Sequence, residues 1–227
     1  SRLLIQGVEL LNDEPGITYS EVGVNGAEVK SFLKCHNLAP QLASVNPDLV
    51  IISLGTNDAY RINFTDSVFY NYYDSLINIV QNALPNSNIL LTTPGDAKRY
   101  RKTPLTENIL IRKSILKLAK KYNCGVWDFF NVMGGLGSIN HWYANNLTTE
   151  DFIHLNEEGY GFQGKLFYQA LSNAYNDYTI KRRIRPLIVK EGIDYKGLVE
   201  GMFSYTPKEP IFFSHYLFWV FFSVFFL

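Results

Sequence analysis

Short apolar runs alternate with amphipathic segments through the central part of the chain, and this alternation is what most constrains its fold. Strands that are apolar throughout are buried on both faces, and helices that cross from one strand to the next cover those faces. The pattern therefore predicts a parallel sheet with helices on its faces. The expected strands cover residues 17–22, 49–54, 88–93 and 125–129. The expected helices cover residues 27–35, 66–83, 106–121 and 157–175, with Asp66 and Thr106 as N-caps.

The charge balance excludes one class of partner. The 227 residues include 21 Lys and Arg against 21 Asp and Glu, so the formal net charge is zero. A neutral chain has no overall field that attracts polyanions, and we expect no nucleic-acid partner. Cys35 and Cys124 lack metal-ligand spacing, and a disulfide between them stays open. Basic residues alternate with apolar ones in the expected helix 106–121, which indicates a solvated basic face.

The two ends differ from the centre. SRLLIQGVELL, residues 1–11, has apolar residues at helical spacing and is expected to be helical. A globular domain is expected over residues 1–178, followed by a basic linker over 179–210 that either contacts anionic lipid or is a solvated tail. IFFSHYLFWVFFSVFFL, residues 211–227, has no Asp, Glu, Lys or Arg. It predicts a C-terminal hydrophobic helix that forms part of a transmembrane span.

Three loops contain residues that could carry chemistry: GVNGAEV (23–29), SLGTNDAY (53–60) and DFIHLN (151–156). The carboxyl ends of parallel strands lie at one edge of a sheet, so we expect these loops to converge there. Gly26 offers a backbone N–H to a developing negative charge, and Asn57 offers an uncharged side-chain NH₂. Both residues also form turns readily, and that role is the alternative for each.

The third loop places an acid three residues before a histidine. At this spacing the carboxylate of Asp151 can bind one imidazole nitrogen of His154, which fixes the tautomer and leaves the other nitrogen free to accept a proton. We therefore expect His154 to be a general base and Asp151 to orient it. Trp142 and Tyr143, in the preceding loop, are expected either to stack on a sugar ring or to pack over a domain edge.

The ordered set GVNGA, GTND and DFIHLN resembles three sequence blocks of the SGNH, or GDSL, hydrolases, and the resemblance covers about residues 1–178. It implies a three-layer α/β/α flavodoxin-like fold and a serine esterase for which no metal or organic cofactor is implied. It also implies that Gly26 and Asn57 are oxyanion donors, that His154 is the general base and that Asp151 orients it. The run from GVNGA through LLTTPGDAKRY is most similar to enzymes that remove O-acetyl groups from polysaccharides. An acetylated carbohydrate is therefore the expected substrate.

The chain departs from the family pattern at three places. Phe152 stands where the family usually has a small residue, and Leu155 where it often has proline. The block Gly-Asp-Ser, which carries the nucleophilic serine of the family, has no counterpart before Gly26. We expect this serine and its strand upstream of Ser1, and we expect the chain alone to have little or no esterase activity. Ser20 and Ser53 are interpreted as structural.

The tail has a resemblance of its own. From Met202 onward it resembles the start of a membrane-bound O-acyltransferase, although a simple membrane anchor explains it equally well. Two further hypotheses follow: an O-acetyltransferase that works with such a membrane partner, and a non-catalytic carbohydrate-binding domain. We expect an extracytoplasmic, membrane-associated protein. Its orientation stays open, because the basic cluster at 181–190 favours the cytoplasmic side.

Overall fold

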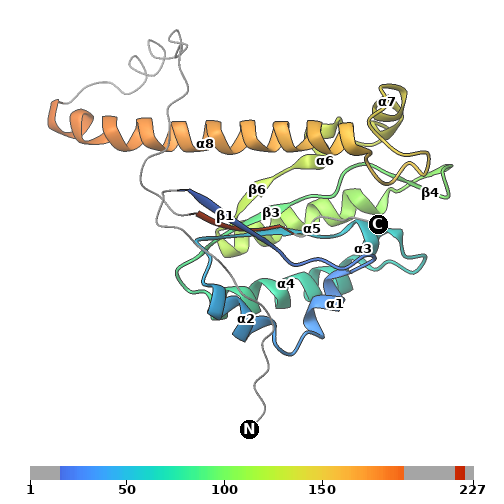
Figure 1. The fold of residues 1–227 in the computed structure, drawn as a ribbon, viewed down its shortest axis with the longest axis horizontal. Coiled ribbons are helices and arrows are strands. Elements are labelled where there is room, and N and C mark those ends of the chain that lie inside the picture. Colours follow the sequence, from blue (N-terminus) through green and yellow to red (C-terminus); the bar gives the residue numbers. More distant parts are fainter. Residues whose placement is uncertain (1–15, 192–217, 223–227) are drawn as a thin grey trace.

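The computed structural model of the chain describes residues 16–191 and 218–222 (Figure 1). Its main sheet has the strand order β1-β7-β2-β3-β6, and every pair of neighbours is parallel. The strands are β1 (Ile17–Glu21), β2 (Leu49–Ser53), β3 (Asn88–Thr92), β6 (Gly125–Trp127) and β7 (Phe218–Phe222). The four strands predicted from the sequence are confirmed, and each differs from its predicted bounds by two residues or fewer.

The helices and a small hairpin join these strands. The helices are α1 (Val29–Leu33), α2 (Leu38–Val45), α3 (Thr56–Tyr60), α4 (Asp66–Ala83), α5 (Glu107–Tyr122), α6 (Phe129–Met133), α7 (Ile139–Ala144) and α8 (Glu157–Glu191). An antiparallel hairpin of β4 (Lys98–Arg99) and β5 (Thr103–Pro104) lies between β3 and α5. The sequence pattern predicts the long helices α4, α5 and α8, whereas it does not predict the short helices α2, α3, α6 and α7 or the hairpin.

Two hydrophobic clusters cover the two faces of the sheet. Along β2, Val50 and Ile52 belong to a cluster with α1, α2, α4 and α5, whereas Ile51 belongs to a cluster with α6, α7 and α8. This alternation follows from the period of two in a strand. Figure 1 shows α8 on one side of the sheet and α1, α2 and α4 on the other. The predicted three-layer α/β/α fold is therefore confirmed.

Two helix predictions need correction. The helix predicted over 27–35 spans only Val29–Leu33, and α2 follows it after a turn at residues 34–37. The predicted bounds of α4 are confirmed, but its N-cap is Thr65. Asp66 lies in the first turn, where its carboxylate accepts a hydrogen bond from the hydroxyl of Ser114 (2.7 Å). This long-range contact gives Asp66 a role that the local sequence does not show.

The C-terminal hydrophobic helix predicted over 211–227 is not present at 218–222, where the chain forms strand β7. Its sequence, FWVFF, consists of aromatic and β-branched residues, which suit a strand that is covered on both faces. The other residues of 211–227, like the helix predicted at 1–11, lie outside the described residues. In the described part of the chain, no helix combines the length and the apolar character that a membrane crossing requires.

Strand β7 lies between β1 and β2, two strands that are consecutive in the rest of the sheet. β1 and β2 follow each other in the chain, yet each pairs with β7 and not with the other. In the flavodoxin-like order 2-1-3-4-5, this second position belongs to the first strand of the fold. A strand from the C-terminus thus lies where this architecture places its first strand. The helix predicted over 157–175 also needs correction, because α8 continues to Glu191.

Candidate active site

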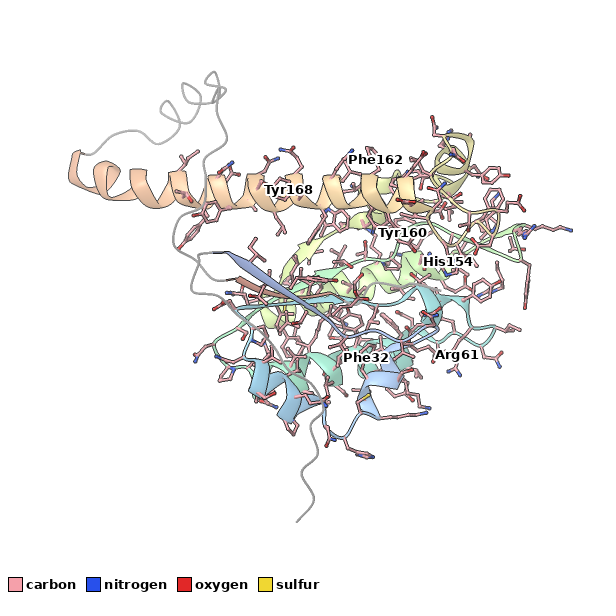
Figure 2. The ribbon with its side chains drawn as sticks, in the orientation of Figure 1. Phe32, Arg61, His154, Tyr160, Phe162 and Tyr168 are labelled. Carbon is pink, nitrogen blue, oxygen red and sulfur yellow. The ribbon has the colours of Figure 1, made fainter. Side chains whose placement is uncertain are left out.

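A cavity of about 90 Å³ lies beyond the carboxyl ends of β2 and β3. The loops that follow these two strands, helix α6, and the turn before α8 line it. Asn57 and His154 both contribute to its wall, so two of the three predicted loops converge on one space. Figure 2 shows His154 beside Tyr160, at the end of the molecule where α8 begins.

His154 lines the cavity and is in direct contact with Asp151. The Nδ1 of His154 lies 2.6 Å from Oδ2 of Asp151. An ionised carboxylate only accepts hydrogen bonds, so Nδ1 carries the proton and the lone pair is on Nε2. Within the described residues, this Nε2 has no hydrogen-bond partner, and the half-buried imidazole faces the cavity. The pair therefore has the geometry of a general base with its orienting acid.

Asp151 is held in its charged form. Its Oδ1 accepts the backbone N–H groups of Ile153 (2.8 Å) and His154 (3.0 Å) and the hydroxyl of Thr149 (2.6 Å). Partial burial alone raises the pKa of Asp151, but the hydrogen bonds from His154, Thr149 and the two backbone amides outweigh burial and lower this pKa to about 2. The carboxylate that orients His154 is thus ionised at neutral pH.

Phe152 lies between these two residues in a left-handed conformation, with φ of 58°. Its backbone oxygen accepts the N–H of Lys98 (2.9 Å), and its ring lies between the ring of Tyr143 (4.4 Å between centroids) and the ammonium of Lys98 (4.4 Å from the ring). Left-handed backbone favours glycine because other residues have a Cβ that clashes. This conformation fits the small residue that the resemblance to the SGNH hydrolases implies at this position.

Asn57 joins two of the predicted loops. Its Nδ2 donates a hydrogen bond to the carbonyl of Ala27 (2.9 Å), which leaves its second amide hydrogen available to a ligand in the cavity. Gly26, next to Ala27, has a φ of 71° that suits glycine. It is exposed and is not among the residues that line the cavity. The structure therefore brings Gly26 beside Asn57 in the α3 region but not into the cavity wall.

Asp58, which sequence reasoning does not single out, holds the start of α1 against α3. Both of its carboxylate oxygens accept the backbone N–H of Val29 (3.3 Å each), at the start of α1. The residue is 7% exposed, and burial raises its pKa to about 6 against the opposing effect of the Val29 amide. Only its place directly after Asn57 in GTND hints at this role, because its partner is far away in the sequence.

Arg99 is a second functional candidate that the sequence does not reveal. Its guanidinium donates to the carbonyls of Ala59 (2.8 Å), Tyr60 (3.3 Å) and Arg61 (3.2 Å), and it pairs with Glu107 (3.0 Å). A cation beside the free carbonyls at the end of a helix stabilises that end. Arg99 thus secures α3, the helix that carries Asn57, from its C-terminal side.

Trp142 and Tyr143 have different surroundings. Trp142 is 7% exposed, packs against Phe129, and donates its indole N–H to the carbonyl of Met133 (3.0 Å). This placement favours the core alternative for Trp142 over sugar stacking. Tyr143 is 42% exposed and stacks on Phe152, and neither residue is among those that line the cavity.

Among the serines of the described residues, none is hydrogen-bonded to His154. Ser53 lines the cavity, but its Oγ accepts a hydrogen bond from Thr92 (2.8 Å), and no bond joins it to His154. Ser20 lies in β1, and Ser1 is outside the described residues. Cys35 and Cys124 are free thiols. Across the described ranges, no group of three His, Cys, Asp or Glu side chains is arranged to hold a metal ion.

A parallel α/β/α sandwich with a carboxylate–imidazole pair and an asparagine amide on one cavity is characteristic of acylhydrolases. The sequence model of the GDSL-like lipase/acylhydrolase family matches residues 6–162, and the chain belongs to this family. A comparison with curated proteins gives no match to this sequence.

Solved structures with a similar fold include several esterases. A peptidoglycan O-acetylesterase is 22% identical with a TM-score of 0.65, over 68% of this chain and 46% of that one. The acetyl xylan esterase AlAXEase is 22% identical with a TM-score of 0.53, over 66% and 78% of the two chains. The lipase/acylhydrolase from Enterococcus faecalis is 22% identical with a TM-score of 0.51, over 66% and 72%. The chain thus matches less than half of the peptidoglycan O-acetylesterase, and at these identities the likeness is one of fold.

Proposed function

We propose that this chain is part of a serine esterase that removes O-acetyl groups from a carbohydrate or a cell-wall polysaccharide. The observation that carries the proposal is the contact between Asp151 and His154, whose free Nε2 faces the cavity that Asn57 also lines. This arrangement supplies a base, its orienting acid and an uncharged donor for an oxyanion within one space.

The proposed reaction proceeds through an acyl-enzyme. A serine oxygen attacks the acetyl carbonyl carbon while Nε2 of His154 takes the serine proton. The amide of Asn57 stabilises the negative oxygen of the tetrahedral intermediate, and Gly26, which lies outside the cavity wall, is not assigned this role. The C–O bond to the sugar then breaks, and His154 returns the proton to the departing sugar oxygen. Water repeats the sequence on the acetyl-serine and releases acetate.

The nucleophile is proposed to come from a strand at the second position of the sheet, which β7 occupies in this structure. The carboxyl end of a parallel strand at this position lies beside the end of β2, from which the Asn57 loop starts. A Gly-Asp-Ser segment on that strand would reach the cavity that His154 lines. The free Nε2 of His154 supports this proposal.

The size of the cavity supports a short acyl group. About 90 Å³ is small compared with the hundreds of Å³ that drug-sized ligands require, whereas an acetyl group needs little room. Two of the structures with a similar fold are named as a peptidoglycan O-acetylesterase and an acetyl xylan esterase. Both names support an O-acetylated carbohydrate as the substrate.

The test compares two lengths of the protein on acetylated xylo-oligosaccharide. The chain of residues 1–227 is expected to release little or no acetate, and a form extended upstream to include Gly-Asp-Ser is expected to release it with turnover. His154→Ala in the extended form should abolish that release. Acetate release by the short chain that survives Ser1→Ala and is lost in Ser53→Ala would place the nucleophile in β2 and contradict the proposal. Product analysis with an acceptor sugar separates hydrolysis from acetyl transfer.

A further inference from the structure

The hairpin of β4 and β5 concentrates positive charge in a chain whose net charge is zero. Its sequence from residue 98 is KRYRK, so four of five consecutive residues are basic. The hairpin projects beyond the carboxyl ends of the central strands, at the same end of the molecule as α3 and α7 (Figure 1). A local cluster of this kind creates a positive potential irrespective of the overall charge balance.

The hairpin is anchored to both walls of the candidate active site. The N–H of Lys98 bonds to the carbonyl of Phe152, within the turn that holds Asp151 and His154. The guanidinium of Arg99 binds the carbonyls at the end of α3. The N–H of Tyr100 donates to the hydroxyl oxygen of Tyr60 (3.2 Å), also in α3. The hairpin therefore has a fixed position relative to both the base and Asn57.

The tip of the hairpin has an unfavourable backbone. Lys102 N–H closes a turn on the carbonyl of Arg99 (3.2 Å), and the central residues Tyr100 and Arg101 have φ of 53° and 63°. Turns with two positive φ values favour Asn-Gly, because larger side chains are strained there. The ring of Tyr100 makes an edge contact with Tyr60 (6.0 Å between centroids), but it is still 66% exposed, and Arg101 is exposed as well. Strain at side chains that stay largely exposed points to a function for them.

The charges at the tip are available to a ligand. Arg99 is neutralised by Glu107 and faces inward, with its side chain 15% exposed. Arg101 is opposed only by Glu150 at 3.8 Å, and the two side chains are 62% and 82% exposed. Such a pair contributes little, so the guanidinium of Arg101 can exchange it for a better partner. Lys102 is also exposed, and among the described residues its ammonium has no ion-pair partner.

We propose that this hairpin binds carboxylate groups of the carbohydrate, so that the substrate is an acidic glycan and not a neutral one. Arg101 and Lys102 pair with sugar carboxylates, and the exposed ring of Tyr100 stacks on a sugar face. The inference rests on the proposed esterase function and narrows its substrate class. A planar guanidinium matches a carboxylate in a bidentate manner, and the anchored hairpin presents this contact at the same end of the molecule as the cavity that His154 lines.

The test measures binding of two unacetylated oligosaccharides to the full chain by isothermal titration calorimetry. Tetragalacturonate, which carries carboxylates, is expected to bind about tenfold more tightly than neutral xylotetraose at 50 mM salt, and the preference should vanish at 500 mM salt. The variant Arg101→Gln with Lys102→Gln should lose the preference. A matched variant, Lys113→Gln with Lys120→Gln on the exposed basic face of α5, should retain it.

A second variant separates binding from folding. Tyr100→Asn with Arg101→Gly installs the dipeptide that this turn favours, so it should raise the melting temperature by about 3 °C and still abolish the preference for tetragalacturonate. Loss of binding in a more stable protein does not reflect unfolding. Equal binding of the two oligosaccharides, no binding of either, or an undiminished preference in the double variants would overturn the inference. Because no ester is cleaved, this result is independent of whether the extended protein proves to be an esterase.

Discussion

Asp151 and Asp58 both accept backbone N–H groups in loops of the candidate active site, yet their pKa values are shifted in opposite directions. The carboxylate of Asp151 receives the imidazole, a hydroxyl and two backbone amides, and its pKa falls to about 2. Asp58 is more deeply buried, lies near the negative charge of Glu28 and has fewer donors, and its pKa rises to about 6. The balance between burial and hydrogen-bond donors therefore decides which carboxyl remains charged.

The opposite pKa shifts of Asp151 and Asp58 indicate different roles for the two carboxyl groups. Folding lowers the pKa of Asp151, so its contribution to stability is present above about pH 4 and is lost as the pH falls toward 2. Folding raises the pKa of Asp58, so its contribution is present below about pH 4 and is lost as the pH rises through about 6. We infer that Asp151 is arranged to keep a charge beside His154, whereas Asp58 serves as a buried cap for α1.

The largest expected effect comes from removing the charge that orients the base. Asp151→Asn in the extended, active form should lower kcat for acetate release about 10⁴-fold, because the amide no longer fixes the imidazole tautomer with Nε2 free. Steady-state kinetics on acetylated xylo-oligosaccharide measure this loss. Asp66→Asn is the matched control, since Asp66 accepts a hydroxyl from Ser114 away from the cavity. A loss below tenfold in Asp151→Asn would show that this carboxylate is not the orienting acid.

The value of kcat is expected to be less sensitive to loss of the oxyanion donor Asn57 than to loss of the orienting acid Asp151. Asn57→Ala removes the amide donor and should lower kcat about 10²- to 10³-fold, the usual cost of one oxyanion donor. The substitution also removes the hydrogen bond from Asn57 to the carbonyl of Ala27, which lies in the 26–29 loop. KM is expected to change little when this loop keeps its position. Asn57→Asp sharpens the assignment, because a carboxylate repels the oxyanion and should reduce kcat further. Equal kcat in Asn57→Ala and the parent would remove Asn57 from the mechanism.

The local sequence pattern predicts the contact of Asp151 with His154 but not that of Asp58 with Val29. Asp151 and His154 are three residues apart, so the sequence alone indicates their contact, and the period of α4 predicts its bounds. The cap that Asp58 provides joins residues 29 positions apart, and no periodicity records it. Strand β7 was beyond prediction for a similar reason. An aromatic run such as FWVFF suits a membrane helix or a buried strand, and only the place between β1 and β2 decides between them.

Long-range contacts also explain the missed hairpin and the reassignment of Trp142. The tip at Tyr100 and Arg101 lacks the Asn-Gly signal from which such turns are predicted. In the sequence, Arg99 cannot be distinguished from an exposed surface cation, because its carbonyl partners in α3 are known only from the structure. Trp142 is predicted in a loop, but it lies in α7, and the layer formed by α6, α7 and α8 buries its ring.

Asp58→Asn should remove the pH dependence of stability that the raised pKa of Asp58 causes. The asparagine oxygen still caps Val29, while the penalty for a buried charge disappears. A pKa of about 6 in the fold and about 3.9 unfolded corresponds to about 3 kcal/mol. The free energy of unfolding of the variant should therefore gain about this much relative to the parent between pH 4 and pH 8. Urea denaturation at the two pH values measures it, and a difference that does not change with pH would contradict the raised pKa.

Substitution of Phe152 is expected to have the smallest effect on stability, and it tests the backbone strain in the turn that holds His154. Phe152→Ala and Phe152→Gly both remove the ring and its contacts with Tyr143 and Lys98, so they differ only in the Cβ at a left-handed backbone. Glycine should be more stable than alanine here by about 1 kcal/mol, the reverse of the usual order, because only alanine clashes at φ of 58°. Urea denaturation of the two variants gives the difference directly. Alanine equal to or more stable than glycine would mean that the 151–154 turn adopts another backbone, and the orientation of His154 would have to be assigned anew.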